Sequence, residues 1–179
     1  EGLTIGGTTT WAEIAEADLP PALHALQLAA REVGSRQIQN RGTIAGNLCN
    51  ASPAADGVPP LLVLDAEVEL SASSGVRTLP LADYLTGPRK TQRRPDEILT
   101  AVKIPAKALA GSSHFLKLGA RTYLVISISM VAARVVIEDG IVTEAALSVG
   151  ACGPVAQRLD AAERALVSHP LNPDAVSDQ

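Results

Sequence analysis

Aromatic residues, cysteines and positive charge are all scarce in this chain of 179 residues. Only 2% of the residues are aromatic and the formal net charge is −4, so the chain lacks the stacking side chains and the basic surface that nucleic-acid binding requires. We therefore predict no nucleic-acid partner. The longest apolar stretch, residues 124–137, contains Ser127, Ser129 and Arg134 and is shorter than the about 20 residues of a membrane-spanning helix. This pattern predicts a soluble protein.

The two cysteines, Cys49 and Cys152, are too few for a disulfide framework or a four-ligand metal site. A reducing compartment fits this usage, and no secretion signal opens the chain, so we predict a cytoplasmic location. The chain starts at Glu1 instead of Met, and residues 3–6 read as the end of an element that began earlier. We therefore expect the sequence to be a piece of a longer protein.

The three histidines also predict no metal site. None of His24, His114 and His169 has a cysteine, an aspartate or a second histidine at ligand spacing in the sequence. We expect each of them to be structural or solvated.

Hydrophobic spacing divides the chain into helices and antiparallel strands. Apolar residues at helical spacing predict a helix over 18–34, with Asp18 as its cap, and another over 159–167. Alternating apolar residues predict strands at 68–70, 76–79, 98–104, 130–137 and 141–149. The Asp139-Gly140 pair between the last two strands predicts a hairpin turn. With 46% apolar residues, the chain is expected to form an α+β fold.

Residues 34–60 show no hydrophobic period, so we predict a loop with short turns. A loop of this length in a compact domain is usually functional or disordered. Within it, the small residues of Gly42-Thr43-Ile44-Ala45-Gly46-Asn47 allow backbone N–H groups to approach an anion or an electron-rich ring. The same stretch is also compatible with an ordinary turn.

Polar side chains near this stretch have two interpretations each. Asn47, Asn50 and Asp56 are suited to bind an organic ligand by hydrogen bonds, but also to cap their own backbone in Asx-turns. In the same way, Lys117 and Arg121 either direct charge into a cleft or reach out to water. The basic stretch 89–94 is expected to be a solvated loop.

Longer motifs favour the functional interpretation when they are taken together. The string RQIQNRGTIAGNLCNASPAAD at 36–56 resembles the motif of the FAD-binding medium subunit of molybdenum hydroxylases, the xanthine dehydrogenase, carbon monoxide dehydrogenase and aldehyde oxidoreductase family. Further resemblance lies in GLTIGGTTT at 2–10, PPLLVLDA at 59–66, PDEIL at 95–99, FLK at 115–117 and LSVG at 147–150. These motifs extend over nearly the whole chain.

The resemblance implies an oxidoreductase subunit that binds FAD and passes electrons. In the family, a molybdopterin large subunit oxidises the substrate and a small subunit with [2Fe–2S] clusters relays the electrons. The FAD then delivers them to NAD or another acceptor, a task for which flavin is suited because it exchanges electrons singly or in pairs. The expected partners are these two subunits, and no catalytic acid, base or metal ligand is assigned to this chain.

The resemblance also assigns cofactor-binding residues. Thr43, Ile44, Ala45, Gly46 and Asn47 are expected to wrap the flavin through backbone amides. Asn50 and Asp56 would make polar contacts, Leu99 would pack on the cofactor, and Lys117 would supply positive charge that favours the reduced, anionic ring.

Several features depart from the family pattern. Ala45 stands where a second Gly is frequent, Gln39 replaces an Arg, and Val125 occupies a position that is often acidic. The family's upstream glycine-rich loop, which grips the FAD pyrophosphate, is absent from the sequence, and the C-terminal helix is expected to be cut off after Asn172-Pro173.

We expect two domains: a FAD-binding subdomain at 1–107, without its pyrophosphate-binding half, and a small antiparallel sheet with helices at 111–179. Two other functions stay open. The chain is compatible with a scaffold that docks the partner subunits without binding FAD, and with an isolated small-molecule binding module. Residues 89–94 are also compatible with an acceptor entrance or a subunit interface.

Overall fold

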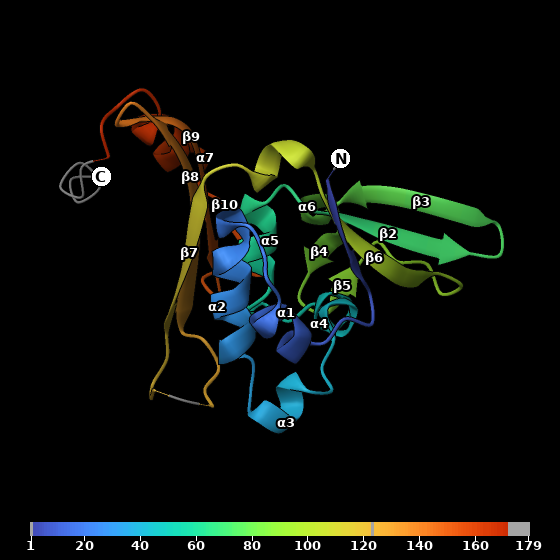
Figure 1. Ribbon diagram of the computed structural model, residues 1–179. Helices are drawn as coiled ribbons and strands as arrows, with labels where there is room; N and C mark the ends of the chain where they lie inside the picture. The colour runs from blue at the N-terminus through green and yellow to red at the C-terminus, as the bar shows by residue number, and fades with distance from the viewer. Residues whose placement is uncertain (1, 123, 172–179) are drawn as a thin grey trace.

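Two four-stranded antiparallel sheets enclose a layer of helices in the computed structural model, which describes residues 2–122 and 124–171 (Figure 1). The strands of the first sheet, in spatial order, are β1 (Leu3–Gly6), β6 (Ile98–Ile104), β2 (Glu67–Ala72) and β3 (Gly75–Pro80). Those of the second are β10 (Gln157–Arg158), β9 (Ile141–Gly150), β8 (Ser129–Glu138) and β7 (Ser112–Leu118). A ribbon of β4 (Leu85–Gly87) and β5 (Lys90–Thr91) completes the strands. This mixture confirms the α+β class.

The helices are short and lie mainly between the two sheets (Figure 1). They are α1 (Trp11–Glu16), α2 (His24–Glu32), α3 (Arg36–Gln39), α4 (Ile44–Asn50), α5 (Val58–Val63), α6 (Leu81–Tyr84) and α7 (Asp160–Leu166), with 3₁₀ turns η1 (Pro21–Leu23) and η2 (Ala106–Leu109). None of the helices in the described residues is long and apolar enough to cross a membrane.

The predicted Asp139-Gly140 hairpin is confirmed, and the strands predicted at 68–70 and 76–79 also pair as a hairpin. Strands β2 and β3 pair from Glu67 opposite Pro80 to Ala72 opposite Gly75. Strands β8 and β9 pair over their whole length around Asp139 and Gly140, which both have positive φ (49° and 80°), as an Asp-Gly hairpin turn requires. The strand predicted at 98–104 is β6.

The loop prediction for residues 34–60 is wrong, because three short helices lie there. Tertiary burial holds them: Ile44 and Leu48 of α4 are fully buried, and every residue of α5 is buried. Helices this short are unstable alone and depend on packing for their stability. Their sequences therefore show no amphipathic period that would predict them. The two prolines of α5 lie in its first turn, where their missing N–H groups cost nothing.

The helix predicted at 18–34 begins later than expected. Asp18 caps no helix; the chain makes the 3₁₀ turn η1 and then enters α2 at His24. Gly34 with φ +55° follows the end of α2, as predicted from its lack of a Cβ. The helix predicted at 159–167 is α7, and the expected break after Asn172 lies outside the described residues.

The helical layer packs against both sheets through two apolar clusters. The larger joins Trp11, Leu23, Leu26, Ile44 and Leu48 to the buried faces of β2 and β6. The smaller joins Ala25 and Ala29 of α2 and Val63 of α5 to the second sheet. Its sheet members are Phe115, Met130, Ala132 and Ala146. Two different faces of α2 therefore pack in the two clusters.

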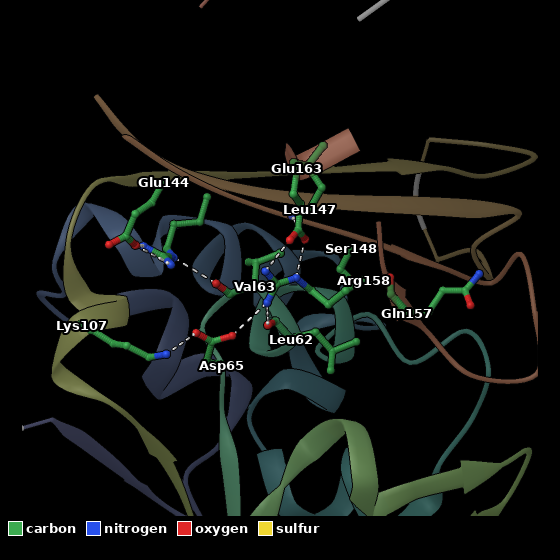
Figure 2. A network of polar contacts seen from close by, with 11 residues as sticks. Leu62, Val63, Asp65, Lys107, Glu144, Leu147, Ser148, Gln157, Arg158 and Glu163 are labelled. Atoms are coloured by element: carbon green, nitrogen blue, oxygen red, sulfur yellow. Dashed lines mark hydrogen bonds and ion pairs between the residues drawn. The ribbon is translucent and has the colours of Figure 1, made fainter. Parts of the chain in front are cut away.

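Two arginines fasten the carboxyl end of α5 to the second sheet (Figure 2). Arg134 of β8 donates to the carbonyl oxygen of Val63 at 3.0 Å and to that of Ala110 at 3.2 Å. Arg158 donates to the carbonyl of Leu62 at 3.0 Å and to both oxygens of Glu163. Cationic side chains are favourable at this end of a helix because its last carbonyls lack intrahelical partners.

Candidate functional site

Helix α4 occupies the glycine-containing motif. Thr43 has extended backbone, and its Oγ1 accepts from the Gly46 amide at 3.0 Å, which caps the helix. Ile44 and Leu48 face the core, and the helix ends at Ala51, which has left-handed φ (47°). The motif therefore folds as a capped helix start followed by a sharp turn.

The expected flavin contacts through the amides of residues 43–47 stay a prediction, and the structure shows the present partners of four of these amides. The Ile44 amide donates to the Thr9 carbonyl at 3.0 Å and the Ala45 amide to the Gly7 carbonyl at 3.2 Å. The Asn47 amide donates to the Thr43 carbonyl at 3.1 Å, and that of Gly46 donates to the threonine side chain. These four amides therefore take part in the first turn of α4 and in the turn after β1.

Asn47, Asn50 and Asp56 instead meet as side chains around a cavity of about 400 Å³. Its opposite wall consists of Leu124, Val125 and Ile126, and Ile38 of α3 adds apolar surface. Ile38, Leu124 and Ile126 are exposed, so this wall offers uncovered apolar surface beside amide and carboxylate groups. Such a combination is typical of organic ligand sites.

Asn47 lines this cavity and has a buried side-chain oxygen. This Oδ1 has no hydrogen-bond partner among residues 2–122 and 124–171. Gly57 crowds the same place, since a Cβ there would lie 3.2 Å from Asn47 Oδ1 and 2.4 Å from the Trp11 ring. An unpartnered buried acceptor costs roughly 1–3 kcal/mol, so a donor from a water molecule or a ligand would stabilise this site. The neighbouring Asn50 Oδ1 accepts from Arg89.

Asp56 and Lys117 form a buried ion pair, which sequence reasoning did not foresee. Lys117 Nζ lies 2.7 Å from Asp56 Oδ2, and their side chains are 6% and 10% exposed. Ser127 donates to the other carboxylate oxygen at 2.7 Å, and Lys117 Nζ also reaches the Glu32 carbonyl at 3.5 Å. Asp56 therefore links α2, β7 and the segment that carries the apolar wall.

The expected roles of Asp56 and Lys117 toward the cofactor stay predictions, and the structure shows the present contacts of both side chains. Both oxygens of Asp56 already accept hydrogen bonds within the protein. The ammonium of Lys117 is opposed by the Asp56 carboxylate, so it supplies no free positive charge. Leu99, 5% exposed, is buried in the core with β6 and is not among the residues that line the cavity.

A second cavity, of about 600 Å³, lies on the other side of Lys117. Its lining includes Arg31, Glu32, Lys117, Arg121 and Val125. Val125 borders both cavities, and Arg121 donates to the carbonyl oxygen of Leu124 at 2.5 and 3.2 Å. The segment after β7 thus forms part of both walls; its apolar residues gave no signal in the sequence because they follow no strand or helix period.

The basic stretch 89–94 is more ordered than a solvated loop. Lys90 and Thr91 form β5, and Arg94 donates its backbone amide to Glu97. The Arg77 guanidinium and this amide hold the pKa of Glu97, which is only 4% exposed, at about 2. Next to it, burial raises the pKa of Tyr84 above its usual range, and its hydroxyl contacts Cys49 of α4.

Comparison with known families gives two matches along the chain. Residues 1–107 match the family described as "FAD binding domain in molybdopterin dehydrogenase". Residues 114–179 match the family described as "CO dehydrogenase flavoprotein C-terminal domain".

Individual relatives agree with these matches. The xanthine dehydrogenase FAD-binding subunit of Escherichia coli O157:H7 is 36% identical over 173 residues, which are 95% of this chain and 59% of the relative. The nicotinate dehydrogenase FAD-subunit of Eubacterium barkeri is 39% identical over 153 residues, 83% of this chain and 52% of the relative. The chain thus spans between half and two thirds of the length of these relatives.

Solved structures show the same fold. A carbon monoxide dehydrogenase from Hydrogenophaga pseudoflava superposes with a TM-score of 0.86 at 24% identity, over 98% of this chain and 61% of its own chain. The reconstituted CO dehydrogenase from Oligotropha carboxidovorans gives a TM-score of 0.84 at 27% identity, over 97% of this chain and 61% of its own.

Proposed function

Since the chain belongs to the family of FAD-binding domains in molybdopterin dehydrogenases, we propose that it is the electron-transferring flavin component of such a dehydrogenase. FAD supplies one- and two-electron transfer when bound. The chain's part is to bind and orient it, and no acid, base or metal ligand of this chain is needed.

The observation that carries this proposal is that Asn47, whose Oδ1 has no partner among the described residues, lines a cavity together with Asn50 and apolar side chains. A flavin ring has a polar edge that carries both N–H and C=O groups, and it has two apolar faces. The side-chain amides of Asn47 and Asn50 are suited to accept from such an N–H and to donate to such carbonyl oxygens. The residues around this cavity therefore fit the cofactor.

We assign the other predicted residues supporting roles. Thr43, Ile44, Ala45 and Gly46 place Asn47 by forming the first turn of α4. Asp56 and Lys117 fix the segment 124–126 that covers the cavity, through Ser127. Leu99 packs in the core beneath α4.

The proposal includes the division of the chain and its partners. We propose a FAD-binding part at 1–107 and a second part at 111–179, each with one of the two sheets. Gly111 stands at this division with φ +79°, where a Cβ would lie 2.1 Å from the Val135 carbonyl oxygen. The proposed partners are an iron–sulfur subunit and a molybdopterin subunit, with NAD or another acceptor receiving the electrons, and the proposed location is the cytoplasm.

A titration of the purified chain with FAD, followed by flavin fluorescence, tests the proposal. We expect one FAD per chain. Asn47→Leu keeps the side-chain size but removes the polar edge, so it should weaken binding about tenfold. The matched control is Asn40→Leu, because Asn40 is exposed and does not line the cavity.

The same variant separates a binding role from a structural one. Asn47→Leu removes a buried acceptor without a partner, so without FAD the chain should unfold at the same or a slightly higher urea concentration. Loss of affinity together with loss of stability would mean that Asn47 only supports the fold. Complete absence of FAD binding would favour the scaffold function, in which the chain docks the partner subunits.

A further inference from the structure

Two of the three histidines lie together although they are far apart in the sequence. His24 is the first residue of α2, and His114 lies in β7, the edge strand of the second sheet. Their ring centroids are 5.9 Å apart and the rings are inclined by 58°. The two elements lie side by side in Figure 1. The fold thus supplies a histidine pair that sequence spacing did not reveal.

A buried hydrogen bond connects the residues next to the two histidines. The residue after His24, Ala25, donates its amide to Ser113 Oγ at 2.8 Å, and Ser113 is the residue before His114. Ala25 is fully buried and Ser113 is 7% exposed. The Ser113 hydroxyl also lies 3.4 Å from the Pro21 carbonyl oxygen. Because neighbouring residues are held inside the protein, the fold fixes the backbone positions from which the two rings extend.

The separation of the rings suits shared coordination of one ion. A metal–imidazole bond is about 2.0 Å long, so two imidazoles on one ion hold their centroids roughly 5 to 6 Å apart. Both histidines are exposed, which leaves room for water at the remaining positions of the ion. Within residues 2–122 and 124–171 no group of three or more His, Cys, Asp or Glu is placed to hold a metal, so the protein would supply two ligands.

We propose that His24 and His114 form a binding site for a divalent transition-metal ion of the zinc, nickel and copper class. Imidazole nitrogen is a preferred ligand of these ions, whereas Mg²⁺ and Ca²⁺ require oxygen ligands. A bound ion joins the start of α2 to β7 across the boundary between the helical layer and the second sheet. It therefore strengthens the attachment of the second sheet. This site is independent of the proposed flavin cavity.

Isothermal titration of the chelator-treated full chain with Zn²⁺ tests the site, with Mg²⁺ as the comparison ion. One Zn²⁺ per chain should bind, and Mg²⁺ should not. Zn²⁺ at about 100 times its Kd should raise the Tm by about 5 °C, because it binds only the folded chain. His24→Gln and His114→Gln should each raise the Kd at least tenfold, and the double variant should lose little more, since one imidazole cannot chelate.

The third histidine and the thiols provide the controls. His169→Gln should keep the Kd, as should Cys49→Ser and Cys152→Ser. Unchanged affinity in either His24→Gln or His114→Gln overturns the proposal, and so does an equal loss in any control variant. If a glutamine variant folds poorly by circular dichroism, the imidazole NMR signals of the unchanged chain decide: Zn²⁺ should shift two of the three histidines, and any other number contradicts the pair.

Discussion

The molecule contains two buried polar groups of different character, one at the carboxyl end of α5 and one beside the smaller cavity. At α5, the guanidinium groups of Arg134 and Arg158 donate to the last carbonyls of the helix and to carboxylates (Figure 2). Beside the cavity, the Asp56–Lys117 pair is also complete, but the neighbouring Asn47 Oδ1 has no partner within the part of the chain that the structure describes.

This difference separates structural support from binding. Polar groups that only hold a fold together are expected to satisfy one another, because each unmet buried group reduces stability. A ligand that supplies a donor to an unmet acceptor gains this energy on binding. The α5 arginines therefore belong to the scaffold, while Asn47 belongs to the candidate flavin site and Asp56 with Lys117 form the support between them.

The largest expected effect is on the ion pair. Lys117→Met leaves the Asp56 carboxylate buried with only Ser127 as a donor, so the free energy of unfolding should fall by about 3–5 kcal/mol. Urea unfolding followed by circular dichroism measures it. Lys107→Met is the matched control, because Lys107 is exposed and its pair with Asp65 at 3.3 Å should contribute less than about 1 kcal/mol. Equal effects in both variants would contradict the supporting role of Lys117.

A smaller effect is expected at the carboxyl end of α5. Arg134→Met leaves the carbonyls of Val63 and Ala110 without this donor, which should cost about 2 kcal/mol of unfolding free energy. FAD affinity should be unchanged, since these carbonyls lie in the scaffold. Arg164→Met, on the exposed side of α7, serves as the control and should cost little. A marked loss of FAD binding in Arg134→Met with stability retained would remove the distinction between the two regions.

The sequence predicts the sheets much better than the small helices. Strand β6 and the β8–β9 hairpin follow from alternation and from Asp139-Gly140, signals that act within a few residues. Helices α4 and α5 were missed because burial against distant strands, and not their own spacing, stabilises them.

The same distinction applies to the candidate site. The motif resemblance selected Asn47, Asn50 and Asp56, which the fold brings to one cavity. It could not reveal that Lys117 pairs with Asp56, because that contact depends on how β7 lies beside the helical layer. The contact between His24 and His114 has the same origin.

The smallest effect concerns a third polar group, the ion pair of the partly exposed Arg77 with Glu97. The pKa of Glu97, about 2, is below the ordinary value of a glutamate. The charge of Glu97 therefore stabilises the fold fully above pH 4.5, and this contribution is lost as the pH falls towards 2. Glu97→Gln should therefore unfold at lower urea concentration than the unchanged chain at pH 7, and the difference should shrink between pH 4.5 and 2. Glu138→Gln, at the exposed end of β8, is the control and should show a smaller difference throughout. A difference for Glu97→Gln that stays constant down to pH 2 would mean that the glutamate charge does not stabilise the fold.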